Sequence, residues 1–568
     1  MQKIALGRLP YFHFTYFIGI FLFMAFSVNT AFAQVPPSAE PGIVTRNLEA
    51  PDRTRSRFED MVVVPDMDEA RAKGSTKKVF VLKGVVLETS TSYKTEDFGK
   101  IYGPYIGQEV SFADINTIAH GMTRKYREDG YIFSRVVLPP QTIKDGMLRV
   151  QAVEGRIANV EVTGNFKDSS GLVQKFADKI RTSGAANTKE IERYLLLIDD
   201  LPGLTARSFM KPSATVGGGD LIIAVEQDLF EGSASIDNRG SRFIGPWRGE
   251  VVGAFNSLFG IHDRTTLRAI LATQTEELRY GEITHEEQIG SEGMRLKGRY
   301  AHTDTEPGGS LSALGIEGDS ALFDLEALYP LLRGRQMNLN LLAGFTANNT
   351  ETDLAGIQIA KDRVRSVRAA GRLDFADPLR GVNQFELMGT KGLDVLNATD
   401  DGTGRSRANG EHEFFRMNAT ATRIQDLWWP QLSLFLSATG QYSRDPLLAS
   451  EEFTVGGPGF GRGYDAGEIA GDRGYAGLAE LRYGGPVDTQ ILKAYQLYTF
   501  IDYGKVKNLS PVVGEVAQDS LTSAGLGVRF NMVYDVSGYV ELDTPLNKQV
   551  NAEGDDDSRL FVSLLKRF

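Results

Sequence analysis

Two kinds of hydrophobic periodicity divide the chain, and the change falls near residue 228. Before it, the segment 112–128 carries apolar residues at helical spacing on one face. These residues are Ile115, Ile118, Met122 and Tyr126. After the change, segments of about eight to twelve residues alternate apolar and polar side chains, which is the period of a half-buried β-strand. The pattern predicts an α+β region followed by an all-β region.

The α+β region reads as two units of about 75 residues with the same order of elements. Each unit runs strand, helix, helix, strand, strand, although the two sequences are not visibly alike. The predicted strands are 79–88, 130–138, 147–153, 157–162, 205–213 and 221–227, and the clearest predicted helices are 112–128, 171–181 and 189–199. The order predicts an internal structural repeat.

The second half contains about sixteen alternating segments, separated by turn residues and polar loops. Examples are 247–255, 337–345, 385–389 and 432–442. An even number near sixteen is in the range of single-chain outer-membrane barrels. The last segment, 560–568, ends on Phe568, and Lys566 shares its apolar face at a height where a lysine can snorkel. A soluble β-sandwich or propeller is the alternative for this half.

Composition narrows the class of protein. The chain has 568 residues and no cysteine, which excludes disulfides, thiolate metal sites and cysteine catalysis. A net charge of −11 argues against a nucleic-acid partner. A mean hydropathy of −0.21 is too polar for a helical membrane protein of this size, whereas a barrel averages its apolar and polar faces.

The first residues have the order of a secretory signal peptide. Lys3 and Arg8 precede an apolar run over 11–28, and Ala31-Phe32-Ala33 then resembles a cleavage site. We therefore expect residues 1–33 to be a signal peptide. A retained membrane anchor is the alternative, because the run is about 18 residues long.

A glycine-rich stretch, 453–483, interrupts the alternating segments. Arg462 lies in its middle, between Gly461 and Gly463. An arginine inside a barrel needs a partner, since an unpaired charge away from water is costly. Asp502, in the later segment YTFIDYG, is the candidate partner. A long loop with a charge and a fixed partner suggests a gate or plug, and a static structural ion pair is the alternative.

The first resemblance to a known family lies in residues 130–155. The residues that carry it are Gly130-Tyr131, Pro139-Pro140-Gln141, Asp145-Gly146, Leu148 and Glu154-Gly155. In this order they resemble the first periplasmic POTRA module of two-partner-secretion transporters. Any short piece alone is an ordinary strand–turn–strand.

The second resemblance lies in the glycine-rich stretch. GRGYDAG, at 461–467, resembles the tip of the family's inward-folded loop, and 471–475 resembles its return into the wall. The segment 500–504 resembles the inner-wall motif that holds the tip. Gly461 departs from the valine common there. Over nearly the whole mature chain, the sequence resembles the TpsB branch of the Omp85 superfamily, the haemolysin-activator transporters.

The resemblance implies two sets of site residues. The loop lock is formed by Arg462, Gly463, Tyr464, Phe500, Asp502 and Gly504. Tyr464 and Phe500 are the aromatics available to stack on the guanidinium. The candidate partner-binding residues of the first module are Phe112, Tyr131, Leu138, Gln141, Leu148 and Val150, and the alternative is that they form only the module core.

The fold implied is α+β periplasmic POTRA modules followed by an all-β transmembrane barrel of about sixteen antiparallel strands. Its expected divisions are a signal peptide at 1–33, a linker or plug helix at 34–76, POTRA modules at 77–155 and 156–228, and a barrel at 229–568 with an inward loop at 456–475. Residues 41–46 resemble the start of a plug helix, but Pro51 would end any helix early, so a linker is equally compatible. Glu480 fits a lumen-facing or an exposed barrel carboxylate.

The function implied is an outer-membrane pore that recognises a large unfolded TpsA-type exoprotein in the periplasm and exports it without nucleotide hydrolysis. Expected partners are the exoprotein's N-terminal secretion domain, outer-membrane lipid and the barrel-assembly machinery. A barrel-assembly insertase and a passive porin or adhesin barrel are the alternatives. An insertase usually carries three or five modules, and the chain has room for two before the barrel.

Enzyme signals are absent from the sequence. His285-Glu286-Glu287 lacks the second histidine of a zinc-binding helix, and no G-x-S-x-G or nucleotide-binding loop is present. We therefore expect no enzymatic activity, no cofactor and no metal.

Overall fold

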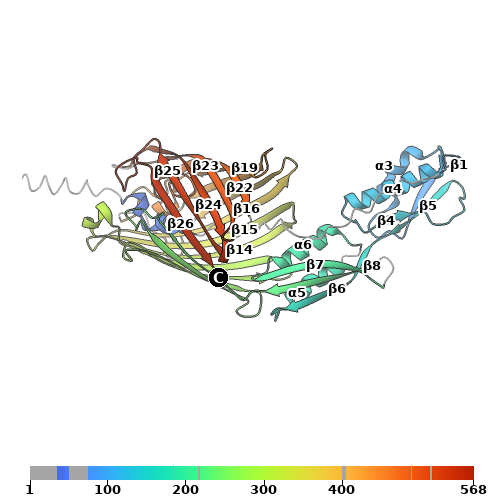
Figure 1. The fold of residues 1–568 in the computed structure, drawn as a ribbon, viewed down its shortest axis with the longest axis horizontal. Coiled ribbons are helices and arrows are strands. Elements are labelled where there is room, and N and C mark those ends of the chain that lie inside the picture. The colour runs from blue at the N-terminus through green and yellow to red at the C-terminus, as the bar shows by residue number, and fades with distance from the viewer. Residues whose placement is uncertain are drawn as a thin grey trace, which may run out of the picture.

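The computed structural model describes residues 35–49, 75–182, 185–214, 218–399, 404–487, 489–511 and 515–568. The predicted signal peptide lies outside these residues, as does most of the predicted linker. In the described ranges, no helix combines the length and the apolar character needed to cross a bilayer. Figure 1 shows a barrel to the left and two smaller α+β units in line to its right.

The first unit, which we call module 1, contains five strands, a short helix and a long helix. They are β1 (Lys78–Val81), β2 (Gly84–Glu88), α3 (Gly99–Tyr102), β3 (Glu109–Ser111), α4 (Phe112–Glu128), β4 (Arg135–Val137) and β5 (Met147–Val153). A three-stranded sheet has the order β2-β5-β4, and β1 pairs with β3 apart from it. The helix predicted at 112–128 is confirmed at both ends. Ser111 and Asp114 form the capping box that begins it.

Two predicted strands of module 1 were too long. The strand predicted at 79–88 is broken at Leu82, whose N–H donates to Gln108 O over 3.0 Å, and at Lys83, whose N–H donates to Gly146 O over 2.8 Å. These bonds turn the chain from one sheet to the other. The strand predicted at 130–138 is reduced to β4, because the residues before it form a turn.

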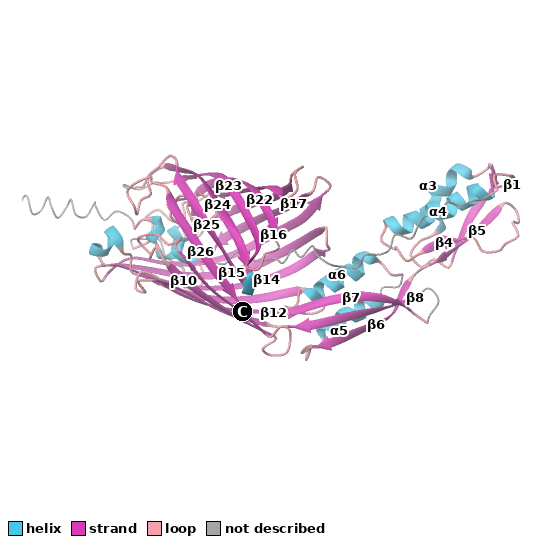
Figure 2. Cartoon of the chain, viewed as in Figure 1, coloured by secondary structure: helices cyan, strands magenta, loops and turns pink. Residues whose placement is uncertain are grey.

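The second unit, module 2, repeats the arrangement with two helices against a sheet (Figure 2). Its elements are β6 (Arg156–Asn165), α5 (Leu172–Thr182), α6 (Thr188–Asp199), β7 (Leu204–Pro212) and β8 (Gly218–Gln227). The sheet order is β6-β8-β7. Val173, Phe176 and Ile180 of α5 are fully buried against it.

The remaining strands close into a barrel of sixteen antiparallel strands. They are β9 (Phe230–Asp237), β10 (Arg248–Asn256), β11 (Arg264–Ala272), β12 (Arg279–Ile289), β13 (Met294–Thr305), β14 (Ile316–Arg333), β15 (Met337–Leu354), β16 (Ile357–Asp377), β17 (Gly381–Gly392), β18 (Phe415–Asp426), β19 (Leu432–Ser443), β22 (Arg473–Pro486), β23 (Leu492–Lys507), β24 (Gln518–Met532), β25 (Val536–Pro545) and β26 (Arg559–Arg567). The predicted number of strands is confirmed.

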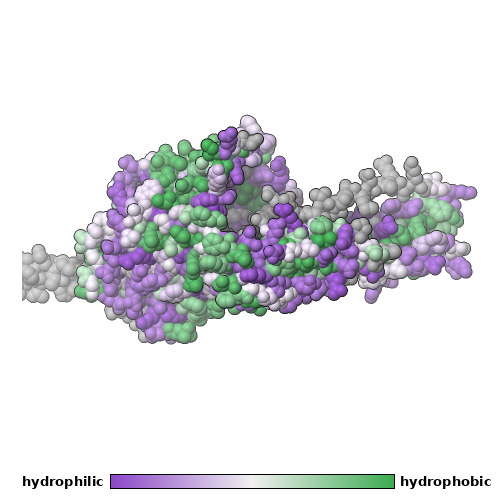
Figure 3. Space-filling model, turned by 60° about the horizontal axis from the view of Figure 1, so that its bottom comes forward, coloured by the Kyte–Doolittle hydropathy of each residue, from purple (hydrophilic) through white to green (hydrophobic). Residues whose placement is uncertain are grey.

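Side chains alternate between the outside and the lumen along each strand, as the sequence pattern predicts. On β23, Ile501 and Tyr503 are exposed on the outer wall, whereas Asp502 is 2% exposed and faces inward. Figure 3 shows hydrophobic side chains gathered over the barrel wall, with hydrophilic side chains around them. An apolar band of this kind suits contact with lipid.

Module 2 is held against the barrel turns that face it. Arg333, at the end of β14, donates to both carboxylate oxygens of Asp200 over 2.7 Å. Arg193 of α6 donates to Pro330 O over 3.0 Å and to Glu292 O over 3.2 Å. Bidentate arginine–carboxylate pairs fix geometry well, so these bonds orient module 2 on the barrel.

A short helix, α2 (Pro41–Asn47), lies inside the barrel, at the end remote from the modules (Figure 1). It contacts β13, β14 and β15, and Thr45 donates to Thr303 Oγ1 of β13 over 2.8 Å. The alternatives left open for 41–46 are thus resolved for these residues in favour of a helix. The helix is short, since Leu48 already carries its C-cap.

Candidate functional site: the inward loop of the barrel

The glycine-rich loop folds back into the lumen between β19 and β22. Two short strands, β20 (Phe453–Val455) and β21 (Ile469–Gly471), pair as its stem, and β20 and β21 both contact β23. Gly456 and Gly457 leave the stem at φ 120° and 94°, a region that only glycine adopts without strain. A side chain at Gly456 would collide with Asp465 O. These glycines therefore allow the loop to turn tightly.

Arg462 lies at the tip of this loop and is held by the barrel wall. Its backbone N–H donates to Asp502 Oδ2 over 3.0 Å. Its guanidinium donates to Glu480 Oε2 over 2.5 Å and lies 3.5 Å from Glu541 Oε2. The guanidinium carbon also lies 4.5 Å from the centre of the Phe500 ring. We call these five residues the tip cluster.

Arg462 and Asp502 are in contact, but the predicted ion pair between their side chains is wrong. Asp502 accepts the backbone N–H of Arg462 and the hydroxyl of Ser523, the latter over 2.5 Å. The guanidinium sits several bonds farther along the side chain, so a carboxylate at the backbone does not meet it. Its ion-pair partners are Glu480 on β22 and Glu541 on β25.

Further charges surround the tip cluster. Glu480 also accepts from Arg529 over 2.8 Å and from Arg482 over 2.6 Å. Glu541 pairs with Arg239 and accepts from the Tyr498 hydroxyl over 2.5 Å. Because Glu480 and Glu541 are 0% and 3% exposed, these ionised groups depend on their partners for stabilisation.

Sequence reasoning missed Arg239, Arg482, Tyr498, Arg529 and Glu541. Glu480 was noticed, and the structure places it in the lumen. The available signal was the spacing of charges by two within a strand, as in Glu480 and Arg482, which puts both on one face. Spacing alone does not say which strands meet across the lumen.

The other predicted lock residues lie at the same place. Gly463 N–H donates to Ser523 Oγ over 3.1 Å, and Tyr464, 1% exposed, donates to Asn547 Oδ1 over 3.0 Å. Gly504 lies under Val455 of the loop stem, where a built Cβ would overlap the valine side chain. The structure therefore brings all six predicted lock residues together around the loop.

The loop also contacts both strands that close the barrel. Arg239, just after β9, donates to Arg462 O over 2.9 Å. Arg559, the first residue of β26, donates to Asp465 Oδ1 over 2.6 Å and to Gly463 O over 3.3 Å. The ladder between β26 and β9 runs through Ser563–Arg567 against Ser233–Asp237, a shorter register than the other barrel pairs have.

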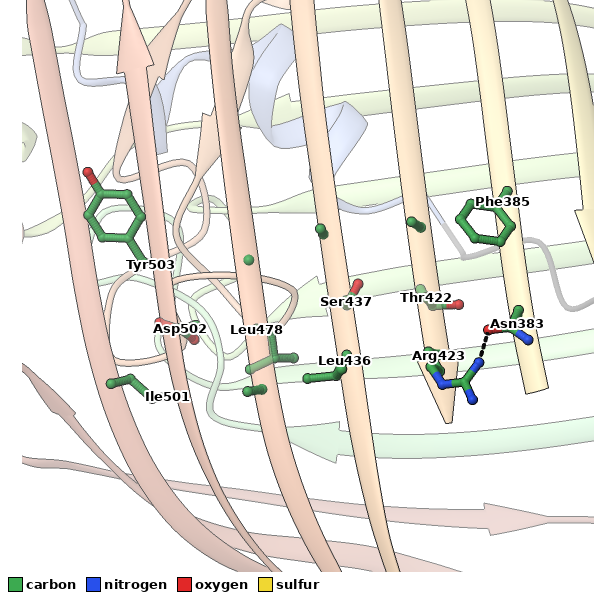
Figure 4. Close-up of a pocket in the computed structure, with 14 residues that line it drawn as sticks. Asn383, Phe385, Thr422, Arg423, Leu436, Ser437, Leu478, Ile501, Asp502 and Tyr503 are labelled. Carbon is green, nitrogen blue, oxygen red and sulfur yellow. Dashed lines mark hydrogen bonds between the residues drawn. The ribbon is translucent and has the colours of Figure 1, made fainter. Parts of the chain in front are cut away.

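The outer wall behind the tip carries a shallow groove of its own (Figure 4). The small residues Ala421, Ala438 and Gly477 line it, together with the outward-facing Ile501 and Tyr503. Asp502 projects from the same strand, β23, to the lumen side. The groove is thus separated from the tip cluster by the wall itself.

The candidate partner-binding residues of module 1 divide into two groups. Leu148 and Val150 are 1% and 0% exposed in the core, so their prediction as partner contacts is wrong. Alternate apolar residues on β5 point into the module, which the period-2 pattern already indicates. Phe112 is 52% exposed at the start of α4.

Tyr131, Leu138 and Gln141 are intermediate in exposure. Tyr131 and Leu138 pack against the core of module 1. Gln141 bonds to the backbone of Arg149, accepting over 2.8 Å and donating over 2.6 Å. These three residues therefore support the module fold.

Glu154 closes module 1 at the end of β5. Burial raises the pKa of this carboxyl, but hydrogen bonds from Thr91, Ser92 and Tyr126 outweigh it and lower the pKa to about 2. The next residue, Gly155, accepts Ala186 N–H of module 2 over 2.7 Å. The carboxylate thus fixes the chain where the modules meet.

Comparison with protein families gives two matches. Residues 217–530 match the family described as haemolysin secretion/activation protein ShlB/FhaC/HecB. Residues 80–155 match the POTRA domain of ShlB type.

Characterised relatives resemble most of the chain. The haem/hemopexin transporter protein HuxB of Haemophilus influenzae (strain 86-028NP) is 22% identical over 481 residues, which are 84% of each protein. The hemolysin transporter protein HpmB of Proteus mirabilis is 22% identical over 69% of this chain and 70% of that protein.

Two solved structures share the fold. CdiB from Escherichia coli superposes with a TM-score of 0.79 at 18% identity, over 95% of this chain and 100% of that one. CdiB from Acinetobacter baumannii gives 0.67 at 14% identity, over 97% of each chain. The likeness extends from the modules through the barrel.

Proposed function

Because the chain belongs to the haemolysin secretion/activation family, we propose that its inward loop is the gate of a two-partner-secretion transporter. Members of this family, TpsB, are outer-membrane pores that secrete partner exoproteins and have no enzymatic activity. The chain is therefore an outer-membrane transporter with periplasmic POTRA modules. The residues of the loop close the pore and open it for export in this proposal.

The tip cluster is the main support for the gate proposal. Its carboxylates join the loop to β22, β23 and β25 through Glu480, Asp502 and Glu541, and the neighbouring bond from Gly463 to Ser523 adds β24. Charge-assisted bonds of this kind are directional and are replaced readily by water once the groups separate. These bonds thus hold the loop in one position while the pore is closed. When an exported chain enters, water replaces the bonds and the loop leaves the pore.

The exported partner is a TpsA-type exoprotein that enters unfolded. The relatives carry names that refer to haem/hemopexin transport and to a haemolysin. Export without nucleotide hydrolysis draws its free energy from binding in the periplasm and folding outside. Outer-membrane lipid surrounds the barrel, and the barrel-assembly machinery inserts it.

Module 1 receives the partner's N-terminal secretion domain in this proposal. Its sheet order, β2-β5-β4, leaves β2 and β4 as edges, and an extended peptide pairs with such an edge through backbone hydrogen bonds. Phe112 is the exposed aromatic of the module. A partner side chain that covers Phe112 would add apolar contact to the backbone bonds.

The gate is tested by tethering the loop. The chain has no cysteine, so a pair introduced as Gly463→Cys and Ser523→Cys is the only thiol pair. A Cβ built at Gly463 lies 3.0 Å from Ser523 Cβ, so a shift of about 0.5 Å brings the pair to the roughly 3.5–4.5 Å of disulfides. Export of the partner is expected to stop when the pair is oxidised and to return when it is reduced.

The reduced protein is the control for crowding, because the built Cβ also lies 2.9 Å from Pro545 N. Single-cysteine variants control for thiol chemistry. Equal export in both redox states, with the disulfide verified by mass, would show that the loop stays in place and that the gate proposal is wrong.

Partner reception is tested by two matched aromatic substitutions. Phe112→Ala removes the exposed aromatic of module 1, and Phe209→Ala removes an equally exposed one, 53%, from β7 of module 2. We expect only Phe112→Ala to weaken binding of the purified secretion domain. Equal binding by both variants would exclude Phe112 from the contact.

A further inference from the structure

A histidine and two aspartates form a cluster on the outer face of the barrel, away from the loop. His302 and Asp304 lie on β13, and Asp319 lies directly opposite Asp304 on β14. Tyr300, two residues before His302 on the same face, is 47% exposed on the outer wall. Thr303, between them, points into the lumen and contacts Thr45 of α2.

The cluster sits at the outer end of these strands. Module 2 contacts the opposite ends, near Glu292 before β13 and Arg333 at the end of β14. Asp304 is ten residues along β13 from its start at Met294, which corresponds to roughly 33 Å of extended chain. The side chains therefore stand at the rim above the apolar band, where water and ions have access.

The spacing of the three side chains suits a shared metal ion. His302 Nε2 lies 3.2 Å from Asp304 Oδ1 and 3.4 Å from Asp319 Oδ2. All three candidate ligand atoms lie within 4.8 Å of one another. Two ligands bonded at about 2.1 Å to one ion, at angles between octahedral and tetrahedral, lie roughly 3.0–3.4 Å apart.

The charges also call for a cation. Directly opposed carboxylates on neighbouring strands repel each other. Glu351 of β15 extends the acidic row, since it lies opposite Asp319, but Lys361 pairs with it. Among the described residues, His302 is the ion-pair partner of Asp304 and Asp319, and no lysine or arginine reaches either. Even a protonated imidazole supplies only one positive charge for two carboxylates.

We propose that His302, Asp304 and Asp319 bind one divalent transition-metal ion, of which Zn²⁺ is the representative. An imidazole nitrogen with two carboxylates selects such ions over Ca²⁺ and Mg²⁺, which take oxygen ligands. The three side chains are 40–49% exposed, so water completes the coordination from the outside. The ion joins β13 to β14 beside Thr303, the residue that holds α2.

Zinc titration of the purified full-length protein tests this site. The tag is removed and the protein is stripped with chelator before calorimetry in detergent. We expect one equivalent of Zn²⁺ to bind saturably, and His302→Gln to weaken it more than tenfold, because even loss of a residue behind a ligand costs about 10–100-fold. His412→Gln is the matched control, since His412 has a single carboxylate partner at 3.9 Å.

A second readout uses Co²⁺ in place of Zn²⁺. Its visible absorption reports coordination by the imidazole, and it should be present in the native protein and in His412→Gln but absent in His302→Gln. Asp319→Asn, which keeps the side-chain size, should lose affinity as well. The absence of saturable binding, or equal affinity in His302→Gln and the native chain, would overturn the proposal.

Discussion

The tripeptide Arg-Gly-Tyr occurs twice in this chain, at 462–464 and at 473–475, and the two copies lie in different surroundings. In the first, Arg462 and Tyr464 are 7% and 1% exposed inside the lumen. In the second, the residues begin strand β22, and Tyr475 is 56% exposed on the outer wall. The same three residues thus serve as a loop tip in one place and as barrel wall in the other.

The partners of the two arginines explain the difference. Arg462 meets two buried carboxylates and the Phe500 ring. Arg473 donates to Ser443 O over 2.7 Å and lies 4.4 Å from the Tyr442 ring centre. Loss of Arg473 leaves only a neutral carbonyl near the rim without its donor. Loss of Arg462 removes one of the cations that neutralise two buried carboxylates. The partners, rather than the motif, therefore decide which copy carries function.

The largest expected difference between the two copies appears when each arginine is removed in turn. Arg462→Ala should destabilise the barrel by about 1.5–3 kcal/mol, as for hydrogen bonds to charged groups, because Glu480 and Glu541 keep other arginine partners, and it should impair export. Arg473→Ala should cost less than about 1.5 kcal/mol, as for a typical hydrogen bond. Denaturant unfolding in detergent measures both, and export of the partner is scored in cells where insertion is verified. Similar losses in the two variants would contradict the distinction.

A double-mutant cycle sharpens the assignment of partners at the tip. Arg462→Gln and Glu480→Gln should be coupled by about 1–3 kcal/mol, because their charged atoms lie 2.5 Å apart. Arg462→Gln and Asp502→Asn should be nearly additive, since Asp502 bonds to the backbone that both variants keep. Unfolding free energies of the single and double variants supply the cycle. Strong coupling to Asp502 alone would restore the ion pair predicted from sequence.

The two tyrosines give a smaller contrast. Tyr464→Phe removes a hydroxyl that bonds to Asn547 over 3.0 Å and should cost about 1 kcal/mol. Tyr475→Phe removes an exposed hydroxyl on the outer wall and should stay within about 0.5 kcal/mol. The same unfolding assay compares them, and equal effects would mean that Tyr464 does not depend on its hydroxyl.

Acid provides the mildest perturbation, and the carboxyl group considered is Glu154 of module 1. Because the pKa of Glu154 is lowered from 4.5 to about 2, its contribution is present above pH 4.5 and is lost as the pH falls toward 2. The group is partly exposed, so the loss should be under about 1 kcal/mol after solvent screening. Pepsin digestion of the full chain between pH 4 and 2 should cut within 80–155 first, and Glu154→Gln should remove part of this pH dependence.

The architecture could be predicted from the sequence because the helical and the alternating hydrophobic patterns are both strong. The helix 112–128, the alternating strands and the terminal strand follow from local patterning alone. The inward loop was also predictable, since its glycines and Arg462 do not fit a barrel strand.

The pairing within the lumen was not predictable in the same way. Glu541 lies 79 residues from Arg462, and only the closure and stagger of the barrel bring them together. The error at Leu148 and Val150 has a different origin. Both lie on the buried face of a strand, so their apolar side chains serve packing instead of partner contact.

Gly467, near the end of the inward loop, lies against α2. A Cβ built there would be 2.9 Å from Ile43 Cγ2 and 3.0 Å from Asn47 Nδ2, so the helix occupies the room that a side chain would need. Helix and loop are therefore in close contact inside the barrel. Displacing one leaves a void against the other, and a void in packed protein costs free energy. Moving either the helix or the loop out of the barrel therefore also removes packed surface from the other.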